Sequence, residues 1–475
     1  MEGRESAVAE NLINELKEAH SGGFVYTPTD MTGEKQLRKI GLELEFIMVK
    51  SSGASMGHTA ELSDTLSVLR RITEKDGTWD AVEKGMRLKK DVGVQERGGK
   101  KRYELSIGTD LGSGLLEVNF LPFERLSGAE DHFREMMALV SHAAEENNML
   151  ILGYGVQPMS KRSTDYMMPK ARYGLLLERY GENLLNFTLP AANQVHFEVS
   201  IGESIHALNM LNRASPAIIA MTANASIMHG ERTKYLDIRN MFWKWLVNGR
   251  KEDWERVGIA PDFADHDNYF SRLLEFQPFM TKREEYMSVS GYRSLAEFIK
   301  AEDASAIRIG SRERVGIVPS ITDVYFQEGT VWWDARLKSS YGTIELRCPS
   351  LQPSTKEILA VAALGLGLIE NLGEASKRLS LYSENGLKRA RHDAIRMGLG
   401  AKIVCGNDRE DIAVLAKDLL SISWKGLRRR GLVEEKYLDP LYSRISEMRV
   451  PAQKSERVLN EKGFQEFVES ARLRI

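Results

Sequence analysis

The sequence predicts an α+β protein built on an antiparallel sheet, with helices on one face of the sheet. The first observation is that apolar residues alternate with polar residues or glycine over residues 40–46 and again over 193–201. The second observation is that helical patterns of varied length separate the strands. Parallel strands buried on both faces would read as continuous apolar runs, so the alternation favours an antiparallel sheet over a doubly wound α/β sheet.

The first half of the chain begins with an amphipathic helix. Apolar residues recur at helical spacing over residues 5–20, and glycines at 22 and 23 end the pattern. Strands are then predicted at residues 40–47, 86–92, 102–107 and 115–120. The pair Gly98-Gly99 lies between basic neighbours and indicates the tip of a hairpin.

A long helix follows, and Ser127 to Glu130 form a predicted capping box at its start. A pair of helices is predicted over residues 203–229, with a break near Pro216, because proline removes a helical hydrogen bond. From Pro353 onward the pattern is mainly helical. The remaining predicted strands cover residues 151–157, 193–201, 330–336 and 343–347.

The composition is that of an ordinary globular protein. The chain has 65 Lys and Arg against 67 Asp and Glu, a formal net charge of -2, and 42% hydrophobic residues. This balance argues against a disordered chain and against nonspecific binding to nucleic acid or to a membrane surface. The longest uncharged apolar run, Ile358–Ile369, is shorter than the ~20 residues of a membrane-spanning helix. No secretory signal is visible and the chain has only two cysteines, so we expect a cytoplasmic protein.

Two carboxylates, Glu43 and Glu45, lie two residues apart on the first predicted strand and therefore share one face of it. Adjacent anions repel each other unless a cation lies between them, and Mg²⁺ prefers carboxylate oxygens. A solvated sheet face would show the same pattern, so the pair alone leaves both interpretations open. Asp110 and Glu117 add two carboxylates near a second strand, where Glu117 interrupts an otherwise apolar run.

Two later strands also carry polar groups on one face. Gln194, His196 and Glu198 alternate with apolar residues, and whether Glu198 is a ligand or a surface residue stays open. Glu345 and Arg347 form either a surface ion pair or, beside a metal, an arrangement suited to phosphoryl transfer. A sheet face built only for solvent would favour Lys, Thr and Ser. Together the four strands therefore indicate a cleft that holds a nucleotide and a metal.

Five segments together resemble the glutamate–cysteine ligase family, in the branch of the plant-type enzymes and the bacterial carboxylate–amine ligases. They are GLELEF, LGYGVQPMSKRSTDYMMPKARYGLL, NQVHFEVS, YLDIRNMFW and WWDARLKSSYGTIELR. The first resembles the G-x-E-x-E strand of the family, and the last resembles its W-D-x-R…G-T-x-E-x-R signature. The resemblance extends from about Ile40 to about Leu372.

This resemblance implies a glutamine-synthetase-like fold, in which a curved antiparallel sheet forms a funnel with helices on its outer face. ATP and two or three Mg²⁺ ions are implied at one end and the amino acids at the other. The implied metal ligands are Glu43, Glu45, Asp110, Glu117, His196 and Glu345. The other implied roles are catalysis by Arg347 and Glu345, substrate binding by Arg239 and Gln194, and nucleotide binding by Arg336, Lys170 and Arg172.

The expected activity is an ATP-dependent ligation of the γ-carboxylate of glutamate to the amine of cysteine, through a γ-glutamyl phosphate. The sequence departs from the family after Arg347, where Cys348-Pro349-Ser350 stands in place of an acidic residue. A ligase of the same mechanism with another acceptor amine is therefore the nearest alternative. A guanidino phosphotransferase and a non-catalytic ATP-binding regulator are more distant alternatives.

The expected organisation is an N-terminal helical segment (residues 1–36), a catalytic domain (37–375) and a helical C-terminal region (376–475). We expect small-molecule substrates, no nucleic acid or membrane partner, and a monomer or homodimer. An acyl phosphate must be protected from water. The loops around Gly98 and Pro169 are the candidate lids.

Overall fold

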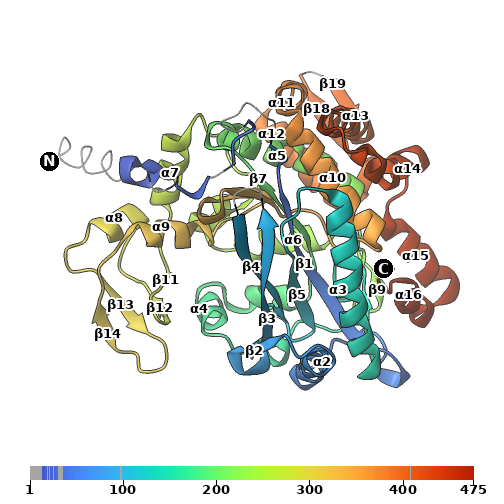
Figure 1. Cartoon of the computed structure of the whole chain (residues 1–475), viewed down its shortest axis with the longest axis horizontal. Coiled ribbons are helices and arrows are strands. Elements are labelled where there is room, and N and C mark those ends of the chain that lie inside the picture. Colours follow the sequence, from blue (N-terminus) through green and yellow to red (C-terminus); the bar gives the residue numbers. More distant parts are fainter. Residues whose placement is uncertain are drawn as a thin grey trace.

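The computed structural model describes residues 13–18, 20, 22–24, 26–29, 36–96, 99–406 and 408–475. Within this part of the chain the main sheet is nine-stranded and antiparallel, which confirms the α+β class (Figure 1). Eight strands follow one another across the sheet, and β6 (Met149–Leu152) pairs with β1. Their order is β16 (Ala335–Lys338), β17 (Thr343–Leu346), β7 (Asn193–Glu198), β1 (Ile40–Lys50), β5 (Leu115–Asn119), β4 (Gly99–Thr109), β3 (Arg87–Glu96) and β2 (Asp80–Val82).

The register of the central strands brings the polar positions together. Glu43 of β1 lies opposite Gln194 of β7, and Glu45 lies opposite Glu117 of β5. Because directly paired residues of neighbouring strands point to the same face, the carboxylates and the amide gather on one side of the sheet. The alternating pattern of the sequence therefore predicted the face of each residue correctly.

The other face of the sheet is apolar and is covered by helices. Helix α10 packs on β7, α5 packs on β16 and β17, and α3 packs on β6. Figure 1 shows these long helices on one side of the strands, with α4 on the other. The helices in this layer and around it are α2 (Leu62–Lys75), α3 (Leu126–Glu146), α5 (Ile201–Thr222), α10 (Thr355–Glu370), α11 (Leu372–Leu379), α12 (Glu384–Met397), α13 (Ile412–Arg430), α14 (Asp439–Glu447), α15 (Pro451–Lys462) and α16 (Phe464–Ser470).

Small residues let the helices approach the sheet and one another. Phe197 of β7 lies directly over Gly365 of α10, where any side chain would overlap its ring. Helix α13 packs against α10 in the same way, because a methyl group on Gly426 would overlap the carbonyl oxygen of Gly367. The glycines of α10 therefore allow β7 and α13 to pack closely against this helix, as expected for a buried apolar helix.

Gly426→Ala is expected to destabilise the fold by about 1–3 kcal/mol, because the backbones of α10 and α13 must separate to admit the methyl group. The matched control is Gly373→Ala in α11, where an added Cβ meets nothing within 4 Å. That substitution should raise stability by about 0.5–1 kcal/mol through helix propensity. Urea unfolding of both variants measures the effects. Equal shifts in the two variants would contradict the close contact.

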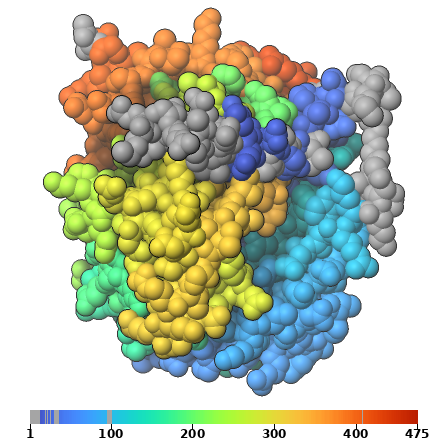
Figure 2. All heavy atoms as spheres, turned by 90° about the vertical axis from the view of Figure 1, so that its left-hand side faces the viewer, coloured from blue at the N-terminus to red at the C-terminus, as the bar shows by residue number. Residues whose placement is uncertain are grey.

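The remaining elements lie at the rim of the sheet. A four-stranded antiparallel sheet projects beside α4 (Ala171–Tyr180), and Figure 2 shows it, in yellow, across a hollow from the blue strands of the main sheet. Its strands are β11 (Met280–Lys282), β12 (Tyr286–Ser288), β13 (Ser305–Arg308) and β14 (Arg314–Gly316). The two-stranded pairs are β8 (Ile227–Met228) with β9 (Glu231–Arg232), β10 (Val257–Gly258) with β15 (Trp332–Trp333), and β18 (Lys402–Cys405) with β19 (Asp408–Asp411). The remaining helices are α6 (Arg239–Leu246), α7 (His266–Glu275), α8 (Leu295–Lys300) and α9 (Ile321–Glu328).

Two predicted helix boundaries are wrong. Helix α3 begins at Leu126, one residue before the predicted capping box, and the Leu126 N–H is capped at 2.8 Å by the distant carboxylate of Glu434. Helix α5 continues through Pro216 as one helix. Most of its residues are buried against the sheet and against α12 and α13, and this packing holds the helix together despite the lost hydrogen bond.

Other predictions hold in outline. Strand β7 is shorter than predicted, because Ser200 caps α5 and ends the alternation at Glu198. The strand predicted at 151–157 is also shorter, since β6 ends at Leu152. Residues 13–18 are helical as predicted, whereas residue 98 of the predicted hairpin tip lies outside the described residues. In the described ranges no single helix is long and apolar enough to span a membrane, and α10 with α11 meets the criterion only as a pair bent by 93°.

The predicted boundary at residue 375 stays a prediction. Buried apolar residues on both sides of it, such as Leu364 of α10 and Leu419 of α13, belong to one hydrophobic cluster. The C-terminal helices therefore pack on the same core as the sheet.

Candidate active site

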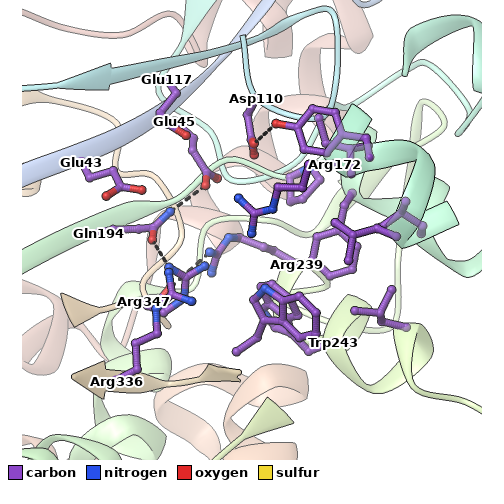
Figure 3. Close-up of a pocket in the computed structure, with 18 residues that line it drawn as sticks. Glu43, Glu45, Asp110, Glu117, Arg172, Gln194, Arg239, Trp243, Arg336 and Arg347 are labelled. Atoms are coloured by element: carbon purple, nitrogen blue, oxygen red, sulfur yellow. Dashed lines mark hydrogen bonds between the residues drawn. The ribbon is translucent and has the colours of Figure 1, made fainter. Parts of the chain in front are cut away.

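A pocket opens on the polar face of the main sheet and encloses about 850 Å³ including its open mouth. Figure 3 shows carboxylates on one side of the pocket and guanidinium groups on the other. The acidic wall consists of Glu43, Glu45, Asp110 and Glu117, and the arginine wall consists of Arg172, Arg239, Arg336 and Arg347. Gln194 lies between the walls, and the apolar end is lined by Leu111, Tyr173, Leu176, Leu184, Phe187, Pro190, Trp243, Leu246 and Trp332.

The acidic wall comes from two strands and from the turn after a third strand. β1 supplies two of its carboxylates, β5 supplies Glu117, and Asp110 directly follows β4. Outside the wall, Asn119 Nδ2 donates to Glu117 at 2.8 Å and the Tyr173 hydroxyl donates to Asp110 at 2.9 Å. These neutral donors orient the carboxylates without neutralising them.

Two carboxylates of the acidic wall have raised pKa values, because they are buried and lie close to other carboxylates. Burial raises the pKa of Glu45 to about 8, and the charges of Asp110 and Glu117 add to the effect, against the opposing charge of Arg239. Burial and the charges of Glu43 and Asp110 raise the pKa of Glu117 to about 7. Like charges that are held together in this way favour a bound cation.

Glu43 differs from its neighbours because cations surround it. Burial alone would raise its pKa, but the contact with His196 and the charges of Lys338 and Arg347 lower the pKa well below its usual range. The Glu43 oxygen lies 3.1 Å from His196 Nε2, and His196 Nδ1 lies 3.2 Å from the Thr343 hydroxyl. Burial lowers the pKa of His196, so a neutral imidazole donates one N–H to an ionised Glu43.

Glu345 lies at the base of the arginine wall and is fully buried. Its two oxygens accept hydrogen bonds from Arg336 Nε at 2.7 Å and from Arg347 Nη1. Arg347 Nη1 also donates to Gln194 Oε1 at 2.6 Å, and Gln194 Nε2 donates to Glu45 at 2.6 Å. One hydrogen-bonded chain thus crosses the pocket from the arginine wall to the acidic wall, and Gln194 is the link.

The other two pocket arginines are held differently. Arg239 donates to the backbone carbonyls of Arg347 at 3.1 Å and of Cys348 at 3.2 Å, which are neutral acceptors. Arg172 has no hydrogen-bond partner in the described ranges, and its Nε is buried. Both groups are therefore available to an anionic ligand in the pocket.

Most of the predicted site residues line the pocket. The exceptions are Lys170, His196 and Glu345, together with Glu198, whose role the sequence left open. Lys170 Nζ instead donates to the Thr109 carbonyl at 2.7 Å and lies 3.4 Å from Glu83. Glu198 lies at the far end of β7 and accepts a hydrogen bond from the Lys39 N–H at 3.0 Å. Suitable oxygens and nitrogens of Glu43, His196 and Glu345 lie within 4.8 Å of one another, so the arrangement can accept a metal.

Sequence reasoning missed the apolar end of the pocket. Trp243 stacks on Trp332 with ring centroids 5.7 Å apart and lies 4.4 Å from the ring of Phe187. It also missed Lys338, which lies two residues after Arg336 on the same face of β16. Burial and the charge of Arg336 lower the pKa of Lys338 to about 8. The two-residue spacing from Arg336 would have placed Lys338 on the same face of the strand. The aromatic residues come from separate segments, and no sequence pattern connects them.

Comparison with known proteins identifies the family. A model of glutamate-cysteine ligase family 2 matches residues 39–467. The chain belongs to this family. Among curated relatives, glutamate–cysteine ligase A, chloroplastic, of Oryza sativa subsp. indica is 25% identical over 375 residues, covering 76% of this chain and 71% of that one. The Arabidopsis thaliana glutamate–cysteine ligase, chloroplastic, is 23% identical over 387 residues, covering 79% and 68%.

Solved structures support the fold. The glutamate–cysteine ligase of Francisella tularensis, crystallised in complex with AMP, superposes with a TM-score of 0.51. The match covers 92% of this chain and 88% of that one, at 12% sequence identity. The predicted ligase fold of this family-2 member is thereby confirmed, and the family match includes the C-terminal helices that the sequence motifs did not reach.

A buried carboxylate beneath the arginine wall gives a pH prediction. Asp237 is fully buried, and burial raises its pKa to about 6 against the opposing charge of Arg239. The pKa of an aspartate side chain in the unfolded chain is about 3.9. Folding therefore takes up a proton between these values, and the contribution of Asp237 to stability falls as the pH rises through that window.

Asp237→Asn should remove this pH dependence. The stability of the variant relative to the unsubstituted chain is expected to rise between pH 4 and pH 6.5, by at most about 3 kcal/mol for a shift of two pKa units. Urea unfolding at a series of pH values measures the difference. A difference that stays constant across the series would show that Asp237 is not protonated on folding.

Proposed function

We propose that the protein is an ATP-dependent carboxylate–amine ligase that joins the γ-carboxylate of glutamate to the amine of cysteine. The observation that carries this proposal is the pocket with an acidic wall facing an arginine wall. Phosphoryl transfer to a carboxylate needs both, since one wall must hold cations for the triphosphate and the other must stabilise anionic oxygens directly. The family membership and the ligase relatives support the same chemistry.

Mg²⁺ fits the acidic wall. Its ligands would come from Glu43, Glu45, Asp110 and Glu117, whose hard oxygen atoms suit this ion. Burial and the neighbouring carboxylates raise the pKa values of Glu45 and Glu117, and a bound cation would favour their ionised forms. His196 and Glu345 are weaker candidates, because Glu345 already accepts from two arginines and His196 donates to Glu43. When bound, Mg²⁺ would neutralise phosphate oxygens and orient the triphosphate.

The arginine wall would stabilise the negative charge of the transferring phosphoryl group. A carboxylate oxygen of glutamate attacks the γ-phosphorus of ATP in line, and ADP leaves. Arg347 keeps its charge at neutral pH, since burial and the charge of Arg336 lower its pKa only to about 9. Its guanidinium is held by Glu345 and Gln194, so it is already oriented toward the transferring group before the reaction begins.

The second step forms the amide. The amine attacks the acyl carbon of the γ-glutamyl phosphate, and phosphate leaves with one oxygen that came from glutamate. Arg239 and Arg172 suit the carboxylates of the two amino acids, since among the described residues neither side chain forms an ion pair with a carboxylate. The apolar end around Trp243 and Trp332 excludes water from the acyl phosphate, which would otherwise be hydrolysed. A lid role for the loop around Pro169 is part of this proposal, whereas residue 98 of the other predicted lid lies outside the described residues.

A product assay tests the function. The protein is incubated with ATP, Mg²⁺, glutamate and cysteine, each component is omitted in turn, and the products are measured by mass. We expect γ-glutamylcysteine, ADP and phosphate in equal amounts, and no amide when any component is missing. A panel of other amines tests the nearest alternative, a ligase of the same mechanism with another acceptor.

The same assay separates the more distant alternatives. ADP formation without an amide would indicate a phosphotransferase that acts on a guanidino substrate, and ATP binding without turnover would indicate a regulator. We place the reaction in a reducing compartment such as the cytoplasm, since both Cys348 and Cys405 are free thiols. A monomer or homodimer is the proposed state.

A further inference from the structure

The backbone of Arg347 is hydrogen-bonded to Asp334, which lies between β15 and β16. The backbone carbonyl of Asp334 accepts the N–H groups of Arg347 at 2.8 Å and of Cys348 at 3.3 Å. The position of Asp334 therefore fixes the backbone at the end of β17. Because Arg347 follows β17 directly, Asp334 also fixes the point from which the Arg347 side chain extends.

The carboxylate of Asp334 is almost completely buried, with 2% of its side chain exposed. It accepts hydrogen bonds from Arg391 Nε at 2.6 Å and Nη2 at 2.7 Å, and from the Ser215 hydroxyl at 2.7 Å. A bidentate arginine pair of this kind fixes both partners in one orientation. Arg391 is a residue of α12, and the charge of Asp334 keeps its pKa raised despite burial.

A second branch runs from Arg391 toward Arg239. Arg391 Nη2 lies 3.4 Å from Asn240 Oδ1, and Asn240 Nδ2 donates to the Cys348 carbonyl at 2.8 Å. The same carbonyl accepts from Arg239 at 3.2 Å. Helix α12 is thus connected to the backbone that carries one pocket arginine and to the acceptor that holds the other.

We propose that Arg391 is a positioning residue that sets the geometry of Arg347 and Arg239 without touching the substrates. The inference rests on the proposed ligase function and deepens it, because it makes the C-terminal helical region part of the catalytic apparatus. Arg391 lies outside the pocket lining, so its effect passes through Asp334 and Asn240. Small displacements of a catalytic group are costly, since transition-state stabilisation depends on its placement.

The test compares Arg391→Gln with Arg389→Gln. Arg389 is on the same helix and is exposed, and no hydrogen bond or ion pair of its side chain is found in the part of the chain that the structure describes, so it provides a matched loss of one charge. We expect Arg391→Gln to lower kcat about 10- to 100-fold and to raise the KM for glutamate, while the KM for ATP stays unchanged. Arg389→Gln should retain all three values.

Comparison of kcat, the KM for glutamate and the KM for ATP distinguishes a positioning role of Arg391 from partial unfolding of the variant. A variant that merely unfolds in part would lower kcat through the active fraction and leave both KM values unchanged. Circular dichroism confirms folding, and if Arg391→Gln does not fold, Arg391→Lys replaces it, because lysine keeps the charge but not the two-pronged contact.

Different results would overturn the positioning role of Arg391 and the proposed ligase function. If the unsubstituted chain forms amide and the folded Arg391 variant matches Arg389→Gln in kcat and in the KM for glutamate, the positioning role is wrong. A fall in kcat with both KM values unchanged also overturns it. If the unsubstituted chain forms no amide with any amine, the proposed function itself fails.

Discussion

Arg347→Ala is expected to lower the rate of ATP-dependent amide formation by on the order of 10²–10³. Arg347 is the residue of the arginine wall that is tied both to Glu345 and, through Gln194, to the acidic wall. Its charge matters most when negative charge develops on the transferring phosphoryl group, so the loss should appear in kcat more than in the KM for either substrate. Steady-state kinetics with phosphate release as the readout gives both constants.

A control is needed because only 11% of the Arg347 side chain is exposed. Glu345 keeps a second partner, Arg336, so removal of Arg347 does not leave this carboxylate alone. Arg347→Lys keeps a charge on a flexible stem and should recover part of the lost rate. An alanine variant that folds normally and turns over within threefold of the unsubstituted chain would remove Arg347 from the mechanism.

Glu43→Gln carries the second large expected effect, again on the order of 10² in rate, together with a higher Mg²⁺ concentration for half-maximal activity. Glu43 is ionised, since the contact with His196 and the charges of Lys338 and Arg347 lower its pKa, so its oxygens are ready for a cation. An amide in its place offers a neutral oxygen, which weakens Mg²⁺ binding. Titration of activity with Mg²⁺ at fixed ATP measures the change.

The matched control for this prediction is Glu198→Gln. Glu198 lies on the neighbouring strand β7 but faces the Lys39 N–H, which an amide oxygen also accepts. Its rate and Mg²⁺ requirement should stay at the level of the unsubstituted chain. Equal effects of the two substitutions would mean that the loss at Glu43 is not specific to the pocket.

Local patterns predicted the part of the site that the sheet carries. Glu43, Glu45, Gln194 and His196 could be assigned to one face because strand side chains alternate with a period of two. Glu345 and Arg336 meet because β16 and β17 form a short hairpin that pairs them directly. The convergence of these strands in one sheet was implied by the family resemblance, and the register confirms it.

Features that depend on distant packing were beyond local patterns. The start of α3 is capped by Glu434, which is 308 residues away, so the capping box at Ser127 competed with a partner that sequence spacing cannot show. Pro216 stays inside α5 because the buried surroundings of that helix outweigh the lost hydrogen bond. Arg391 likewise lies 57 residues from Asp334, and nothing in its own segment distinguishes it from Arg389.

The central claim is that a carboxylate of the substrate is activated by phosphorylation in this pocket. Glutamate labelled with ¹⁸O in its γ-carboxylate tests it most directly, in a reaction with ATP, Mg²⁺ and cysteine. We predict that each amide formed releases one phosphate carrying a single ¹⁸O atom, because that oxygen bridges carbon and phosphorus in the intermediate. Amide formation with unlabelled phosphate would contradict the account.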